Sequence, residues 1–190
     1  MSRLLQLLRG PSGHPLHPPL TDGAIGSFST ATVLAIVGAA GWIEDAAGKG
    51  AWLALVVGLA FSAGAAVTGL AELLALDPRS PVFRTALLHL CAMVTAGVLF
   101  GLAAVFQFYG FHDGEVTTSG LVLTLVGFVT LTLGGWLGGT LVFVHGMRVM
   151  SQPERPTRSA IGLRHGALDR EGADRDAEVR RLRRSRLIHR

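Results

Sequence analysis

The sequence predicts an all-α integral membrane protein, a bundle of four transmembrane helices with both termini in the cytoplasm. Hydrophobic residues make up 49% of the chain and charged residues 16%, against roughly 25% charged residues in typical soluble proteins. Residues 23–145 contain nine charged side chains, whereas residues 148–190 contain eighteen, twelve of them Arg. The body of the chain is therefore apolar, and a polar, Arg-rich tail follows it.

Four apolar runs are long enough to cross a bilayer, which requires about 20 helical residues. The predicted spans cover residues 23–42, 51–76, 85–109 and 119–147. These runs are apolar around most of their circumference, and a soluble domain of this size could not shield four such helices from water. We therefore predict three parts: an N-terminal segment (1–22), a membrane domain (23–149) and a basic tail (150–190).

The charges of the connecting loops predict the orientation, because short cytoplasmic loops favour Lys and Arg. Residues 43–50 contain two acidic side chains and one Lys, and residues 110–118 contain two acidic side chains and no Lys or Arg. Residues 77–84 contain Arg79 and Arg84, and the basic tail follows the fourth span. The second loop and both termini are therefore predicted to lie in the cytoplasm.

The C-terminal tail has two interpretations. It is either a solvated appendage or a basic segment that binds anionic lipid headgroups, which is worth about 1 kcal/mol per basic residue near the surface. No nucleic-acid-binding motif accompanies its charge, so we do not predict a nucleic-acid partner.

Glycines at helical spacing predict close helix packing. The fourth span contains two overlapping small-xxx-small pairs, Gly134 with Gly138 and Gly135 with Gly139. Such pairs let helix backbones approach closely in a membrane. The partner helix could belong to this chain, to a second copy of it, or to another membrane protein.

Ionisable groups in an apolar background are costly and are usually functional. In the predicted topology, several of them converge on the cytoplasmic leaflet. Two histidines lie among prolines that we expect to keep the segment extended or turning rather than helical. The converging candidates are His14, His17, Asp22, Glu72, His89 and His145.

Three interpretations of this convergence remain open. His89 and His145 could be the axial ligands of a haem b between facing helices, with His14 and His17 near its propionates or shaping access. All of these His, Asp and Glu residues could instead form a divalent-metal site or a proton path. The third interpretation is structural, with polar side chains that only hydrogen-bond the loop backbone.

Four sequence strings closely resemble one bacterial membrane family, the domain of unknown function 2231. They are GHPLHPPLTDGAIG (13–26), VTGLAE (67–72), RTALLH (84–89) and GWLGGTLVFVHG (135–146). The resemblance implies a four-helix domain of the bacterial cytoplasmic (inner) membrane. Some members are joined to Rieske or c-type cytochrome modules, which implies electron transfer.

This chain has neither the Cys-x-His pairs of a Rieske centre nor a Cys-x-x-Cys-His motif, so a redox partner would be a separate protein. Common hydrolase and phosphate-binding motifs are also absent, and we find no convincing internal repeat. The leading prediction is a small membrane subunit without catalytic activity of its own that binds haem or takes part in redox chemistry. The alternatives are a scaffold or accessory subunit and a divalent-metal or proton-path protein.

Overall fold

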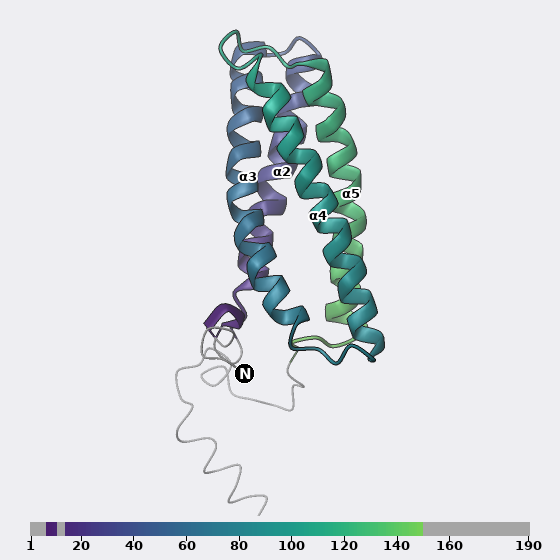
Figure 1. Cartoon of the computed structure of the whole chain (residues 1–190). Helices are drawn as coiled ribbons and strands as arrows, with labels where there is room; N and C mark the ends of the chain where they lie inside the picture. Colours follow the sequence, from purple (N-terminus) through teal and green to yellow (C-terminus); the bar gives the residue numbers. More distant parts are fainter. Residues whose placement is uncertain (1–6, 11–13, 150–190) are drawn as a thin grey trace, which may run out of the picture. The chain divides into compact units, whose positions relative to one another are not determined.

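The computed structural model describes residues 7–10 and 14–149 and contains four long helices in that part of the chain. They are α2 (His17–Ala39), α3 (Glu44–Leu73), α4 (Pro81–Phe108) and α5 (Thr118–Phe143) (Figure 1). All four are long and apolar enough to cross a membrane. The prediction of an all-α, four-span membrane protein is confirmed.

The chain divides into two compact units, Met1–Val149 and Met150–Arg190. The second unit, which is the predicted basic tail, lies outside the described residues. Its predicted contact with anionic lipid therefore stays a prediction. Everything below concerns the first unit.

The first spanning helix, α2, begins at His17, earlier than predicted, which corrects the expected non-helical conformation at His17 but not at His14, which lies outside the helix. Pro18 and Pro19 occupy the first turn of α2. A proline is tolerated there because the first backbone N–H groups of a helix have no partner within the helix. His17 is consequently fixed to a helix.

The last helix ends before His145, which the prediction had placed inside the fourth span. Val144 and His145 both donate their backbone N–H to the carbonyl of Thr140, and Gly146 follows with a φ of +63°. The chain reverses there, and the backbone N–H of Met147 donates to Leu141 O at 2.9 Å. Residues after α5 are therefore directed back toward the bundle.

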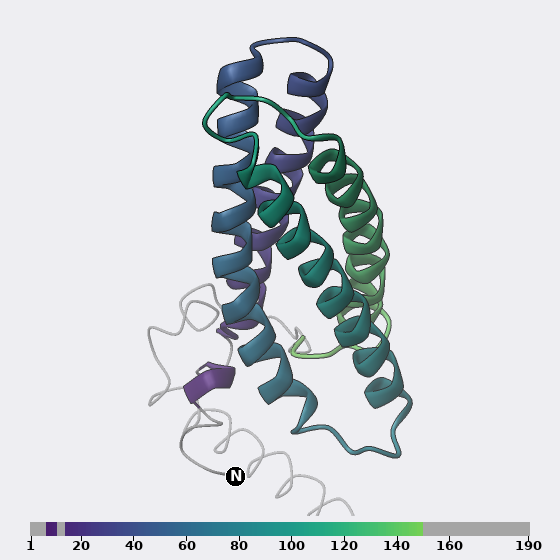
Figure 2. The ribbon, with the colours of Figure 1, turned by 45° about the horizontal axis from the view of Figure 1, so that its top comes forward.

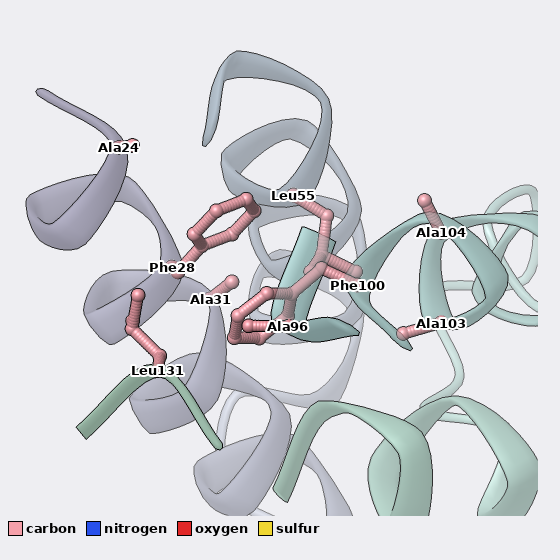
Figure 3. Close-up of a cluster of buried hydrophobic side chains, with 9 residues drawn as sticks. All are labelled: Ala24, Phe28, Ala31, Leu55, Ala96, Phe100, Ala103, Ala104 and Leu131. Atoms are coloured by element: carbon pink, nitrogen blue, oxygen red, sulfur yellow. The ribbon is translucent and has the colours of Figure 1, made fainter. Parts of the chain in front are cut away.

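The bundle consists of two antiparallel hairpins, α2 with α3 and α4 with α5 (Figures 1 and 2). We call the end where α2 and α4 begin the histidine end, and the opposite end the far end. Midway between them lies a cluster of buried side chains (Figure 3). Its members are Ala24, Phe28, Ala31, Leu55, Ala96, Phe100, Ala103, Ala104 and Leu131.

Two stacked phenylalanines join the hairpins at the centre of this cluster. The rings of Phe28 and Phe100 are 3.9 Å apart between centroids and 7° from parallel (Figure 3). Each ring packs on a glycine of its own hairpin. A Cβ atom added at Gly58 would lie 2.6 Å from Phe28, and one added at Gly127 would lie 3.1 Å from Phe100. The glycines therefore leave room for the rings.

The buried positions of the two hairpins correspond to one another. In α2 and α4 the equivalent residues are 72 positions apart in the sequence, and in α3 and α5 they are 69 apart. The equivalent buried pairs are Ala24/Ala96, Phe28/Phe100, Ala31/Ala103, Leu55/Thr124, Gly58/Gly127 and Ala65/Gly134. The chain therefore contains two similar halves that bury equivalent positions. This corrects the sequence-based view that no repeat is present.

The far end is tightly closed. Gln107 is buried, and its amide donates to Glu115 O at 2.7 Å and accepts from the backbone N–H of Thr117 at 3.1 Å. A Cβ atom added at Gly48 would lie 2.1 Å from the carbonyl oxygen of Gly114. The backbone of α3 thus contacts the α4–α5 loop directly.

Candidate functional site: a cavity between two histidines

A cavity of about 440 Å³ lies between the hairpins at the histidine end. All four helices contribute to its wall, which is mostly apolar. Its volume falls in the range of roughly 300–1,000 Å³ that is usual for ligand pockets. The polar side chains that line it include His17, Glu72, His89 and Arg148.

His17 is oriented by the backbone of α3. Its Nδ1 lies 2.9 Å from Ala65 O and 3.3 Å from the hydroxyl of Thr68. A carbonyl oxygen can only accept a hydrogen bond, so Nδ1 carries the proton and donates it. In the neutral ring, Nε2 then keeps its lone pair. Among the described residues, the hydrogen-bonding group near Nε2 is the Thr21 hydroxyl, at 3.5 Å.

His89 is oriented in the same way in the second hairpin. Its Nδ1 donates to Gly134 O of α5 at 2.8 Å. Gly134 is the structural equivalent of Ala65, and His89 is the equivalent of His17. Both imidazoles thus have Nδ1 tied to a carbonyl and Nε2 available, which is the usual second-shell arrangement of metal-binding histidines.

The two imidazoles both line the cavity and lie close to one another. Their ring centroids are 6.4 Å apart and their planes are 87° from parallel. Two imidazoles that bind one metal ion from opposite sides, with metal–nitrogen bonds of about 2.0–2.1 Å, have ring centres roughly 6–6.5 Å apart. The observed separation fits this arrangement.

Glycines make room for both rings. A Cβ atom added at Gly69 would lie 2.8 Å from Cε1 of His17, and one added at Gly138 would lie 3.0 Å from Cε1 of His89. Each glycine follows the carbonyl that holds its histidine by four residues, one helical turn. The two halves therefore share one arrangement, in which a histidine donates to a helix carbonyl and packs on a glycine one turn later.

Glu72 breaks this symmetry at the mouth of the cavity. Its side chain is buried, and Nε of Arg9 donates to its Oε2 at 3.0 Å. Arg148 donates to its Oε1 through Nε at 2.9 Å and Nη2 at 2.6 Å. The equivalent position in the second hairpin is Leu141, which packs in an apolar cluster. Among the described residues that line the cavity, the charged ones are therefore Glu72 and its partner Arg148.

The remaining predicted site residues lie elsewhere. His145 accepts from or donates to the hydroxyl of Thr85, with Nε2 at 3.1 Å from Oγ1. His14 and Asp22 are exposed. None of these three is among the described residues that line the cavity. The structure thus brings together His17, Glu72 and His89 and leaves the other three outside the cavity.

Sequence reasoning did not include Arg148, Gly69 or Gly138 in the site. Of these three, only Gly138 belongs to a small-residue pair that the sequence analysis assigns to helix packing. The constant spacing of 72 residues between His17 and His89, and between Phe28 and Phe100, is the signal that could have revealed the two halves.

The small-residue pairs of α5 divide between two faces. Gly134 and Gly138 face α4, where added Cβ atoms would meet Met93 and His89. An added Cβ atom at Gly135 would meet nothing within 4 Å. One pair therefore packs within the chain, while Gly135 lies on the outer surface of the bundle.

The fold and the site define a class: a four-helix membrane protein made of two similar hairpins, with a cavity between paired histidines. The profile of a family described as a predicted membrane protein (DUF2231) matches residues 13–151. The chain belongs to this family. No curated protein and no solved structure matches the chain.

Proposed function

We propose that the chain is a small multi-pass subunit of the bacterial cytoplasmic membrane that holds a haem b between His17 and His89 and exchanges electrons with a separate protein. The observation that carries this proposal is the matched orientation of the two imidazoles. Each has its Nδ1 proton on a helix carbonyl, and the ring centres are 6.4 Å apart.

The cavity wall suits a flat, largely apolar group. Alanine, leucine, valine and methionine side chains from all four helices line it. Gly69 and Gly138 leave room for the two imidazoles beside the helix backbone. When bound, haem supplies one-electron redox chemistry, and the protein contributes axial ligands and a dry environment that tunes the potential.

This ligand pair differs from the pair expected from the sequence, His89 with His145. His145 hydrogen-bonds to Thr85 and lies beyond the end of α5. His17 occupies the position that is equivalent to His89 in the other hairpin. The proposal therefore keeps His89 and replaces His145 by His17.

A wider divalent-metal site has less support. Within residues 7–10 and 14–149, no three His, Cys, Asp or Glu side chains lie together in a way that could hold a metal ion. Two imidazoles on opposite sides of a cavity suit a cofactor that supplies the metal's other ligands itself, as a porphyrin does.

The loop charges support an orientation with the histidine end toward the cytoplasm. At that end Arg79 lies between α3 and α4 and Arg84 lies in the first turn of α4. At the far end Glu44 and Asp45 lie in the first turn of α3, and Glu115 lies between α4 and α5. Short cytoplasmic loops favour Lys and Arg. The proposed haem would then lie near the cytoplasmic face.

The test is reconstitution of the detergent-purified protein with haemin, followed by absorption spectra before and after reduction. The wild-type protein should give the sharp bands of a six-coordinate, low-spin haem with two imidazole ligands. His17→Ala and His89→Ala should each abolish that spectrum and weaken binding at least tenfold. His145→Ala and His14→Ala, the matched controls, should leave it unchanged.

Absence of haem binding by the wild-type protein would overturn the proposal. A spectrum that survives His17→Ala but is lost in His145→Ala would overturn the ligand assignment and favour the pair expected from the sequence.

A second candidate function, a scaffold or accessory subunit, is favoured by the outer face of α5. Gly135 has open space beside it, and the neighbouring Trp136 is 79% exposed. Such a face can accept a helix of a partner protein or of a second copy. Co-purification with a larger complex, with no haem bound to this chain, would favour this candidate.

A further inference from the structure

The cavity mouth carries an arginine that the histidine pair does not use. Arg148 lines the cavity, and its side chain is 30% exposed. The chain reaches this position by two left-handed residues after α5, Gly146 at φ +63° and Arg148 itself at φ +60°. A non-glycine residue at positive φ is uncommon and persists only when its surroundings hold it there.

Glu72 holds the guanidinium of Arg148 in a defined orientation. The Nε and Nη2 groups both donate to Oε1 of Glu72, and Nη2 also donates to Arg9 O at 2.6 Å. Within the part of the chain that the structure describes, Nη1 of Arg148 has no hydrogen-bond partner. One edge of the guanidinium is thus fixed by a buried carboxylate, and its other terminal nitrogen can bind a further acceptor.

We propose that Arg148 is an anion subsite of the cavity and binds a carboxylate of the ligand, with Glu72 as its positioning residue. This proposal rests on the proposed function, because it concerns a ligand in the same cavity. The ligand is then an amphiphile with an apolar, planar body between the hairpins and a carboxylate at the edge that faces Arg148.

The asymmetry of the site gives this contact a specific consequence. The two imidazoles and their glycines occupy equivalent positions in the two hairpins, so they cannot by themselves distinguish the two edges of a planar ligand. The position equivalent to Glu72 in the second hairpin is occupied by the apolar Leu141. Among the described residues, the ion pair with Arg148 therefore has no counterpart at that equivalent position. Arg148 therefore sets the direction in which the ligand enters and stays bound.

The experiment uses metal-free protoporphyrin IX and its dimethyl ester, which have the same ring but differ in carboxylate charge. Binding to the full chain in detergent is followed by porphyrin fluorescence. Because neither probe contains a metal, His17 and His89 cannot ligate them, and the difference in affinity between the two probes reports on the carboxylate contact rather than on axial ligation. The wild-type protein should bind the dicarboxylate about tenfold more tightly than the ester.

Arg148→Gln should remove this preference. It should lower the affinity for the dicarboxylate about tenfold and leave the affinity for the ester unchanged. Arg148→Lys should restore part of the preference, because Lys keeps the charge without the planar fork. Arg84→Gln, an exposed arginine at the same end of the bundle, is the matched control and should change neither affinity. Unchanged ester binding also shows that each variant is folded.

Three results would each overturn the proposed subsite. They are an equal loss of affinity for both probes in Arg148→Gln, equal affinity of the wild-type protein for both probes, and no binding of the dicarboxylate at all. The haemin spectra test the proposed function separately. Carboxylate-dependent binding of the metal-free porphyrin together with failed axial ligation of haemin would refute the haem proposal and keep the subsite.

Discussion

The two ends of the bundle are built from the same two hairpins, yet one is closed and the other is hollow. At the far end, α3 contacts the α4–α5 loop backbone to backbone at Gly48 and Gly114, and the buried Gln107 satisfies two groups of that loop. At the histidine end the hairpins are separated by a cavity, and ion pairs at Glu72 connect the segments around its mouth.

The difference shows how one helical frame can combine rigidity with a binding site. The far end is held by direct backbone contact and by a buried amide, while the histidine end is held by charged side chains at the rim of a cavity. Stability should therefore depend mainly on the far end, and ligand binding mainly on the histidine end. Four substitutions test this division.

The largest effect is expected at the closest contact of the far end. Gly48→Leu places a side chain where a Cβ atom alone would lie 2.1 Å from Gly114 O. Because the obstacle is backbone, the loop must move, and we expect a loss of about 3 kcal/mol in the free energy of unfolding. Equilibrium unfolding in mixed micelles measures it. Gly101→Leu, at a site where an added Cβ atom meets nothing within 4 Å, is the control.

Glu72→Ala should lower the free energy of unfolding by about 2 kcal/mol. This is less than the loss on breaking a fully buried ion pair, because the guanidinium groups of Arg9 and Arg148 are partly exposed. Glu72→Gln should cost less, since its amide oxygen still accepts a hydrogen bond. Hydrogen exchange should increase at the histidine end and stay unchanged at residues 104–120. Faster exchange at both ends would contradict the separation of the two ends.

Gln107→Leu should lower the free energy of unfolding by roughly 1–2 kcal/mol, because Glu115 O and the backbone N–H of Thr117 lose their hydrogen-bond partner at a buried site. Here hydrogen exchange should increase at the far end while haemin binding stays unchanged. Thr132→Val, which removes a hydroxyl bonded only to its own helix, is the control. Impaired haemin binding in Gln107→Leu would show that the two ends are coupled.

The smallest effect is expected on the outer face of α5. Gly135→Ala should change the free energy of unfolding by less than about 0.5 kcal/mol. The neighbouring Gly134→Ala should cost about 1 kcal/mol, because its Cβ atom would lie 2.6 Å from the flexible Met93 side chain. A large loss in Gly135→Ala that depends on protein concentration would indicate that a second copy covers this face.

The spans could be predicted from the sequence because long apolar runs have few alternatives in a bilayer. The start of α2 could not, because a proline pair is compatible both with an extended segment and with a first helical turn. His89 could be assigned to the site from its depth and its charged neighbours. Its partner could not, because His17 reaches it only through the relation between two hairpins, which no local pattern encodes.

The ion pairs show the same limit. Glu72 stands out as an acid in an apolar helix, but Arg9 and Arg148 lie more than sixty residues away on either side. The Arg148 contact requires the chain reversal after α5, which contains two residues at positive φ. The sequence alone gives no sign that Arg148 adopts this conformation.

The stacked Phe28 and Phe100 rings lie one helical turn beyond Ala24 and Gly97, which line the cavity. They lie on the far-end side of the cavity, between it and the closed end of the bundle. A ligand in the cavity would therefore be separated from the far-end loops by this pair of stacked rings.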